Sequence, residues 1–106
     1  MKHSLSLIAF GRFDKNTLVG FCSIKIEEIK LTIHDIALHR KGAARWGQLP
    51  ARSFVRDGEQ VVGDDGKPKY LVTLEFEGRA VANAFSHAVW RIVFAEHPEL
   101  AAEIAA

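Results

Sequence analysis

Alternation of apolar and polar residues dominates the first three quarters of the chain and predicts β-strands. Residues 2–10 alternate as a half-buried strand does. Residues 18–26 are apolar on both faces in their first half, so this strand needs a cover on each side. The alternation is cleanest over residues 70–76. The side chains of that stretch expected to point inward are Tyr70, Val72, Leu74 and Phe76.

The strand expected over residues 31–39 changes its parity halfway, between Ile33 and Ile36, at His34 and Asp35. One extra residue in a strand shifts the parity in this way, so the pattern predicts a β-bulge. The alternative interpretation of His34 and Asp35 is an acid/base pair, since a carboxylate can orient an imidazole. No serine, cysteine or second carboxylate lies near them in the sequence to act as a nucleophile. We therefore expect the pair to be architectural and the protein not to be an enzyme.

Residues typical of turns separate these strands. Gly42 interrupts the strand pattern, and Pro50 places the following strand at a sheet edge or bulge because proline cannot donate to the ladder. Residues 57–69 contain Asp-Gly twice, which favours a hairpin or loop. Residues 64–66, Asp-Asp-Gly, resemble the start of a calcium loop but lack its alternating oxygen ligands and terminal glutamate. The five histidines have no metal-ligand spacing either, so we expect no metal and no cofactor.

From residue 78 to residue 96 the hydrophobic period becomes that of an α-helix. The stripe expected to pack on the sheet consists of Val81, Ala84, Phe85, Ala88, Ile92 and Ala95. Trp90 and Phe94 lie opposite that stripe, one turn apart, on the face that a monomer would turn to water. They could form a stacking platform, but an exposed Trp/Phe pair on a helix is more often a subunit contact. We expect Trp90, Phe94 and Phe21 at a homodimer interface.

These elements predict an α+β fold with a curved antiparallel β-sheet of four or five strands, and one long C-terminal helix packed on one face. The 106 residues are enough for a single domain, residues 1–106, whose core needs neither a disulfide nor a metal to be stable. Residues 97–106 are expected to be a helix end or a frayed tail. The single cysteine, Cys22, lies mid-strand without a basic neighbour, which predicts a buried, inert thiol. No stretch resembles a signal peptide or a membrane span, so a cytoplasmic protein without membrane contact is expected.

The distribution of charge says more about partners than the net charge of +1 does. Residues 36–56 carry five cations and no acidic residue, whereas the other 85 residues carry 9 basic and 13 acidic ones. The cations of this basic segment are Arg40, Lys41, Arg45, Arg52 and Arg56. They could track a phosphate backbone while Trp46 stacks on a base. The segment therefore predicts nucleic-acid binding. The alternatives are a solvated basic face that meets the chain's own acidic residues, and a protein-interaction module whose basic face binds an acidic protein.

The run LVGFCSIKIEEIKLTIHDIALHRKGAARWGQLPAR, with its Ile-His-Asp-Ile block at residues 33–36 and its Leu-Pro-Ala-Arg segment at residues 49–52, resembles the stage V sporulation protein G (SpoVG) family. The resemblance covers roughly residues 5–93 in layout. It implies a small, homodimeric bacterial regulator that binds DNA or RNA, with an antiparallel sheet and a C-terminal helix. The chain departs from the family in its longer turn at residues 57–69. No residue-level binding motif carries over, so the expected site rests on charge and geometry. No small-molecule substrate is expected.

Overall fold

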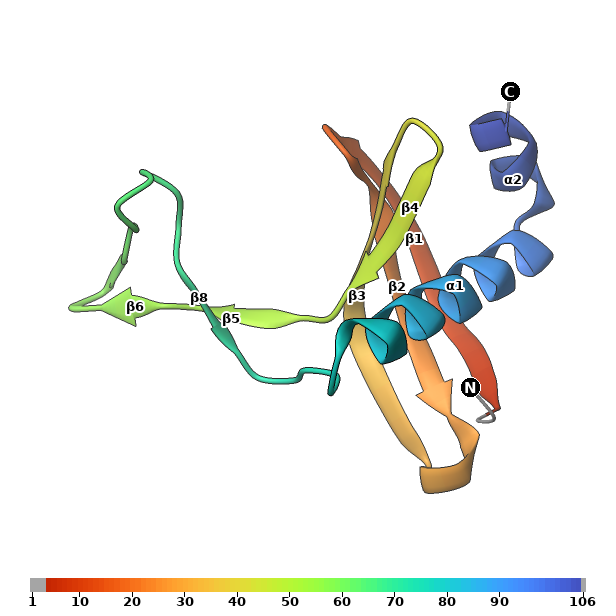
Figure 1. Cartoon of the computed structure of the whole chain (residues 1–106), viewed down its shortest axis with the longest axis horizontal. Helices are drawn as coiled ribbons and strands as arrows, with labels where there is room; N and C mark the ends of the chain where they lie inside the picture. Colours follow the sequence, from red (N-terminus) through yellow and green to blue (C-terminus); the bar gives the residue numbers. More distant parts are fainter. Residues whose placement is uncertain (1–3, 106) are drawn as a thin grey trace.

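The computed structural model describes residues 4–105 and has an α+β fold (Figure 1). Its main sheet is antiparallel, in the order β1-β2-β3-β4, with strands β1 (Leu5–Lys15), β2 (Leu18–Ile26), β3 (Leu31–Lys41) and β4 (Ala44–Gln48). A charged 3₁₀ turn, η1 (Glu27–Ile29), joins β2 to β3. The chain ends in helices α1 (Arg79–Glu96) and α2 (Pro98–Ala105). The predicted class, an antiparallel sheet followed by a C-terminal helix, is confirmed.

Between β4 and α1 the chain leaves the sheet as a narrow ribbon, residues 51–72, which extends away from the body of the molecule (Figure 1). In the ribbon β5 (Ala51–Ser53) pairs with β8 (Tyr70–Val72), and β6 (Val55–Arg56) pairs with β7 (Glu59–Gln60). The strand pattern breaks at Pro50, as expected from a proline, and the chain turns at Asp57-Gly58 as a hairpin. Both residues of this turn have positive φ, which agrees with the Asp-Gly pair in the sequence.

The expectation that residues 70–76 form an inward-facing strand of the main sheet is wrong. The strand β8 ends at Val72 and pairs only with β5, and its Tyr70 and Val72 are 59% and 69% exposed. Leu74 is exposed as well, and only Phe76 packs against the core. Alternation indicates that a strand has one apolar and one polar face, but it does not indicate with which other strand it will pair.

The predicted bulge in β3 is confirmed. Ile33 pairs with Ile24 and Ile36 with Cys22, so His34 and Asp35 together oppose the single residue Ser23. Asp35 adopts a left-handed conformation, with φ of 58°. Aspartate tolerates this conformation better than most residues do because its short side chain can bond locally. The extra residue brings Ile33 and Ile36 to the same buried face.

The core lies between one face of the sheet and α1. The buried residues of α1 are Phe85, Ser86, Val89, Trp90 and Val93. This stripe is rotated around the helix from the expected one. Val81 and Ala95, which were expected to face the sheet, are exposed in the structure. The placement of Trp90 on the outward face is therefore wrong, since its side chain is only 3% exposed. The physical reason is size: the rotated stripe buries large side chains, whereas the expected stripe contained several alanines that contribute little apolar area.

Of the two forms expected for residues 97–106, a helix end or a frayed tail, the structure has a helix, since α2 covers Pro98–Ala105. Leu100 of α2 is buried in the same core as α1. On its outer side Glu103 accepts hydrogen bonds of 2.7 and 2.6 Å from the guanidinium of Arg12 in β1. Cys22 is also buried, and burial raises the pKa of its thiol to about 12, as expected for an inert cysteine. Within residues 4–105, no helix has the length and apolarity needed to cross a membrane.

Candidate nucleic-acid interface

Three cations of the basic segment meet at the tip of the β3–β4 hairpin, residues 40–45, here called the hairpin tip. Gly42, with φ of 59°, allows the tight turn between the two strands. Arg40 is directly opposite Arg45 in the register, and Lys41 is opposite Ala44. All three cationic side chains are exposed. Two like charges in directly opposed positions destabilise a strand pair, so this arrangement costs free energy unless an anion lies nearby.

None of the three cations of the hairpin tip forms an ion pair within the described residues. Glu103 of α2 does lie near this tip, since its pKa is lowered by its hydrogen bonds to Arg12 and also by the charge of Arg40. Among residues 4–105, the ion pairs involve Arg12, Lys25 and His97 as the cationic members. The guanidinium of Arg45 lies instead over the ring of Phe94 in α1, 5.1 Å from its centroid. The exposed cations of the hairpin tip are therefore not held in ion pairs in this part of the chain, and Glu103 is the carboxylate that interacts with the charge of Arg40.

Trp46 lies on the other face of the sheet from Arg45, because successive strand residues point to opposite faces. Its indole stacks on the imidazole of His39, with the ring centroids 5.3 Å apart and the planes 9° from parallel. A hydrogen bond of 2.9 Å joins His39 Nδ1 to the hydroxyl of Thr17 and holds the imidazole in place. One face of the indole is thus occupied within the protein. Trp46 remains partly exposed but does not lie beside the guanidinium groups of the hairpin tip.

The structure separates the other two cations of the segment from the hairpin tip. Arg52 is in β5 and Arg56 in β6, both in the ribbon that extends away from the sheet (Figure 1). The guanidinium of Arg56 lies over the ring of Phe54, 5.9 Å from the centroid. The five cations therefore form two groups and not the single patch that their closeness in sequence suggested.

Helix α1 adds a row of polar side chains to which the charge pattern of the sequence did not point. Its members are Arg79, Asn83, His87 and Arg91, which are all exposed and repeat every four residues along one side of the helix. The row spans about 18 Å at the rise of an α-helix. The four-residue spacing was the available signal, but it becomes informative only once the rotation of α1 on the sheet is known.

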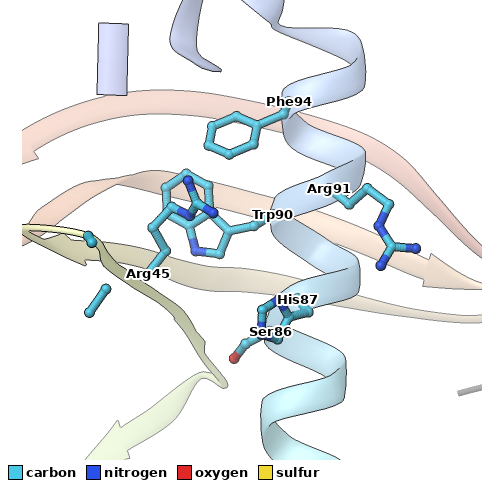
Figure 2. Close-up of a pocket in the computed structure, with 8 residues that line it drawn as sticks. Arg45, Ser86, His87, Trp90, Arg91 and Phe94 are labelled. Atoms are coloured by element: carbon cyan, nitrogen blue, oxygen red, sulfur yellow. The ribbon is translucent and has the colours of Figure 1, made fainter. Parts of the chain in front are cut away.

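A cavity of about 470 Å³ lies between the hairpin tip and α1 (Figure 2). Its lining residues are Ala43, Ala44, Arg45, Ser86, His87, Trp90, Arg91 and Phe94. None of these carries a carboxylate. Figure 2 shows Arg45, Trp90 and Phe94 together on one side of α1, with Arg91 on the other side. The cavity thus combines aromatic walls with cationic groups at its rim.

Hydrogen bonds fix the helix against the edge strand beneath this cavity. The indole N–H of Trp90 donates to the backbone carbonyl of Trp46 over 3.0 Å. The hydroxyl of Ser86 accepts from the backbone N–H of Gly47 at 3.0 Å and lies 3.3 Å from the carbonyl oxygen of the same residue, to which it donates. The side-chain polar atoms of Trp90 and Ser86 are therefore taken up by hydrogen bonds to the backbone of β4. These bonds hold α1 and β4, which form the cavity walls, in a fixed position relative to each other.

The sheet face opposite α1 is open. Phe13 and Phe21 are 55% and 40% exposed there, with ring centroids 6.5 Å apart. A groove of about 620 Å³ runs from this face to the ribbon and is lined by Leu18, Phe21, Asp35, Ala37, His39, Gln48, Leu49, Pro50, Ala51 and Tyr70. Of the residues expected at a homodimer interface, Phe21 is therefore accessible, Phe94 is half-buried and Trp90 is not accessible.

The bulge places Ser23 of β2 beside His34 of β3, although no serine lies near His34 in the sequence. The hydroxyl of Ser23 and Nδ1 of His34 are 2.9 Å apart and share a hydrogen bond. Ser23 is a buried polar residue, and this bond satisfies its hydroxyl. The contact joins the two sides of the bulge across β2 and β3, which is consistent with an architectural role. Within the described residues, no group of three His, Cys, Asp or Glu side chains could hold a metal ion.

Comparison with protein-family models, with curated proteins and with solved structures finds no match to this chain. The resemblance to the SpoVG family therefore stays a prediction, which rests on the short motifs around His34 and Pro50.

Proposed function

We propose that this protein binds nucleic acid through its sugar–phosphate backbone. The contact surface would consist of the hairpin tip and the polar row of α1, which flank the cavity from its two sides. The observation that carries the proposal is the pairing of Arg40 opposite Arg45, neither of which forms an ion pair within the described residues. A polyanion supplies the missing negative charge and gains affinity by releasing its condensed counterions.

The geometry favours contacts that depend little on sequence. Guanidinium groups at an exposed turn and along a helix face can reach phosphate oxygens, and such contacts carry no base information. Arg52 and Arg56 of the ribbon would extend the same contact, since the ribbon projects from the body and can follow a strand beyond it. The resemblance to SpoVG supports the same class of ligand and a regulatory role in a bacterium.

We also propose that two copies pair through the open sheet face and the ribbon. A two-stranded ribbon is at best marginally stable in water, and this one leaves Tyr70 and Val72 largely exposed. The neighbouring Phe13 and Phe21 are exposed on the sheet itself. Pairing would cover both groups while leaving the hairpin tip and α1 free. Phe21 then keeps the role expected from the sequence, and Trp90 does not.

The binding proposal is tested by fluorescence anisotropy with single-stranded DNA, duplex DNA and single-stranded RNA at about 50 mM salt, where phosphate binding is strong. We expect at least one of the three to bind, and the double variant Arg40→Gln/Arg45→Gln to bind it more weakly. The matched control, Lys25→Gln/Lys30→Gln, removes the same charge at the opposite end of the sheet (Figure 1) and should bind as the wild type does. Binding of none of the three would overturn the proposal, and an acidic protein would then be the better candidate partner.

A further inference from the structure

We propose that the cavity between the hairpin tip and α1 holds one unpaired nucleobase, so that the protein prefers single-stranded nucleic acid to a duplex. This inference rests on the proposed function and adds to it the form of the ligand. A base within a duplex is stacked and paired, and it cannot enter a side cavity without being taken out of the helix. A single strand can offer its bases freely.

The size and lining of the cavity fit a planar group attached to an anion. Its volume of about 470 Å³ falls in the lower part of the range for pockets that hold one small organic ligand. The walls contributed by Trp90, Phe94 and the alanines of the turn are apolar, which a hydrated phosphate alone would not require. The rim contributed by Arg45, His87 and Arg91 is basic, which an uncharged apolar ligand would not require. A nucleotide has both properties in one molecule.

The surface on which the base would stack is the planar guanidinium of Arg45, backed by two aromatic rings. The guanidinium is exposed and lies over the half-buried ring of Phe94, which in turn lies 5.2 Å from the ring of the buried Trp90 at 50°. Single-strand binders place bases on such aromatic and guanidinium surfaces. Since the bonds from α1 to β4 hold Trp90 in position, the surface requires little ordering when a base arrives.

The same bonds predict weak discrimination between bases. The indole N–H of Trp90 and the hydroxyl of Ser86 already bond to the backbone of β4, so neither is free to read a base edge. Stacking tolerates any base because every base has a π-face. The backbone of the strand would then cross α1 toward His87 and Arg91, which lie on the rim of the cavity.

The test uses the variant Phe94→Leu in the full chain, with a single-stranded oligothymidylate and a mixed-sequence duplex of equal length as probes. Leucine keeps an apolar side chain against Trp90 but removes the ring. We expect affinity for the single strand to fall by roughly 5- to 150-fold, the range that stacking of one base contributes, and affinity for the duplex to stay unchanged. Phe13→Leu changes an exposed aromatic on the other face of the sheet and is the control that should leave both affinities unchanged.

Fluorescence gives a second measurement that does not depend on Phe94. The chain has two tryptophans, so Trp46→Phe leaves Trp90 in the cavity as the only one. Oligothymidylate should change the emission of the buried Trp90 on binding, because the base stacks on the Arg45–Phe94 pair that is packed against it, whereas the duplex should not. Duplex binding as tight as single-strand binding, or a Phe94→Leu variant with unchanged single-strand affinity, would overturn the nucleobase site and leave the proposed function standing. Failure of the wild type to bind either probe would overturn the nucleobase site, and failure to bind single-stranded RNA as well would overturn the proposed function.

Discussion

Replacing Gly20 by alanine should destabilise the protein strongly, because β1 passes too close to this position for a side chain. A Cβ atom at Gly20 would lie 2.4 Å from the carbonyl oxygen of Gly11 and 3.2 Å from the Cα atom of Arg12. Both are backbone atoms of the paired strand, which cannot rotate away as the end of a flexible side chain can. Next to this point the register of β2 also shifts with both of its neighbours, with β1 between Arg12 and Lys15 and with β3 between Leu18 and Gly20, so the close approach is part of how the sheet is paired.

The expected loss follows from the cost of overpacking. Inserting a methyl group where the backbone must move costs about 1–3 kcal/mol of the free energy of unfolding. For a domain of this size, each kcal/mol lowers Tm by about 4–8 °C, so Gly20→Ala should lower Tm by roughly 4–24 °C. Thermal unfolding followed by circular dichroism measures this directly.

Gly11→Ala is the matched control, since it introduces the same methyl group in the partner strand of the same sheet. Nothing lies within 4 Å of a Cβ atom at Gly11. Alanine there should be neutral or should raise the free energy of unfolding by about 0.4–1 kcal/mol, because it reduces the freedom of the unfolded chain. Equal Tm values for the two variants, or a Gly20→Ala protein as stable as the wild type, would refute the close approach of β1 to β2.

Three further predictions concern the bulge, the buried thiol and the open face. His34→Ala should cost about 1–3 kcal/mol of stability, because the hydroxyl of Ser23 loses its partner, while binding per folded molecule stays the same; full stability with lost binding would instead place His34 in a site. With a pKa of about 12, Cys22 is thiolate at pH 8 in only about one molecule in 10⁴, so iodoacetamide should modify it at least a hundredfold more slowly in the native protein than in urea, and equal rates would contradict its burial. Phe13→Ser/Phe21→Ser should shift the mass in light scattering toward a monomer, and a wild type that is monomeric at about 100 μM would exclude the proposed pairing.

Local rules were sufficient for the parts of the fold that are decided within a few residues. The parity change at His34 and Asp35 predicted the bulge, because the alternation of a strand has no other simple way to slip. The Asp-Gly pair at residues 57–58 predicted a hairpin, because both residues tolerate positive φ. The change of hydrophobic period likewise located the long helix, residues 79–96.

Pairings between distant segments could not be predicted in the same way. The helix sequence offers two overlapping stripes, and the burial of Trp90 follows from the space between the sheet and α1, not from the period of the helix. Residues 70–76 alternate well, yet only residues 70–72 form a strand, which belongs to the ribbon and pairs with β5. Their pairing partner depends on the break at Pro50, and a short stretch of sequence does not reveal how this break changes the pairing of distant strands.

Of the candidate site, the sequence predicted the cations of the hairpin tip but neither the cavity nor the polar row of α1. The charge of residues 40–45 was visible in the sequence, and the hairpin places these cations together because they flank a two-residue turn. The cavity requires Arg45 to meet Phe94, which lies 49 residues further along the chain. Packing of α1 against β4 creates this contact, so neither the cavity nor the polar row beside it could be assembled from spacing alone.

The salt dependence of binding by the wild type and by Arg40→Gln/Arg45→Gln tests the central claim most directly. Each neutralised phosphate contributes about 0.7–0.9 to the slope of log K against log salt concentration, so loss of two contacts per protomer should make the slope shallower by about 1.4–1.8. The Lys25→Gln/Lys30→Gln control should keep the wild-type slope. A slope that the Arg40/Arg45 variant leaves unchanged would contradict phosphate binding at the hairpin tip, even if the protein retained nucleic acid.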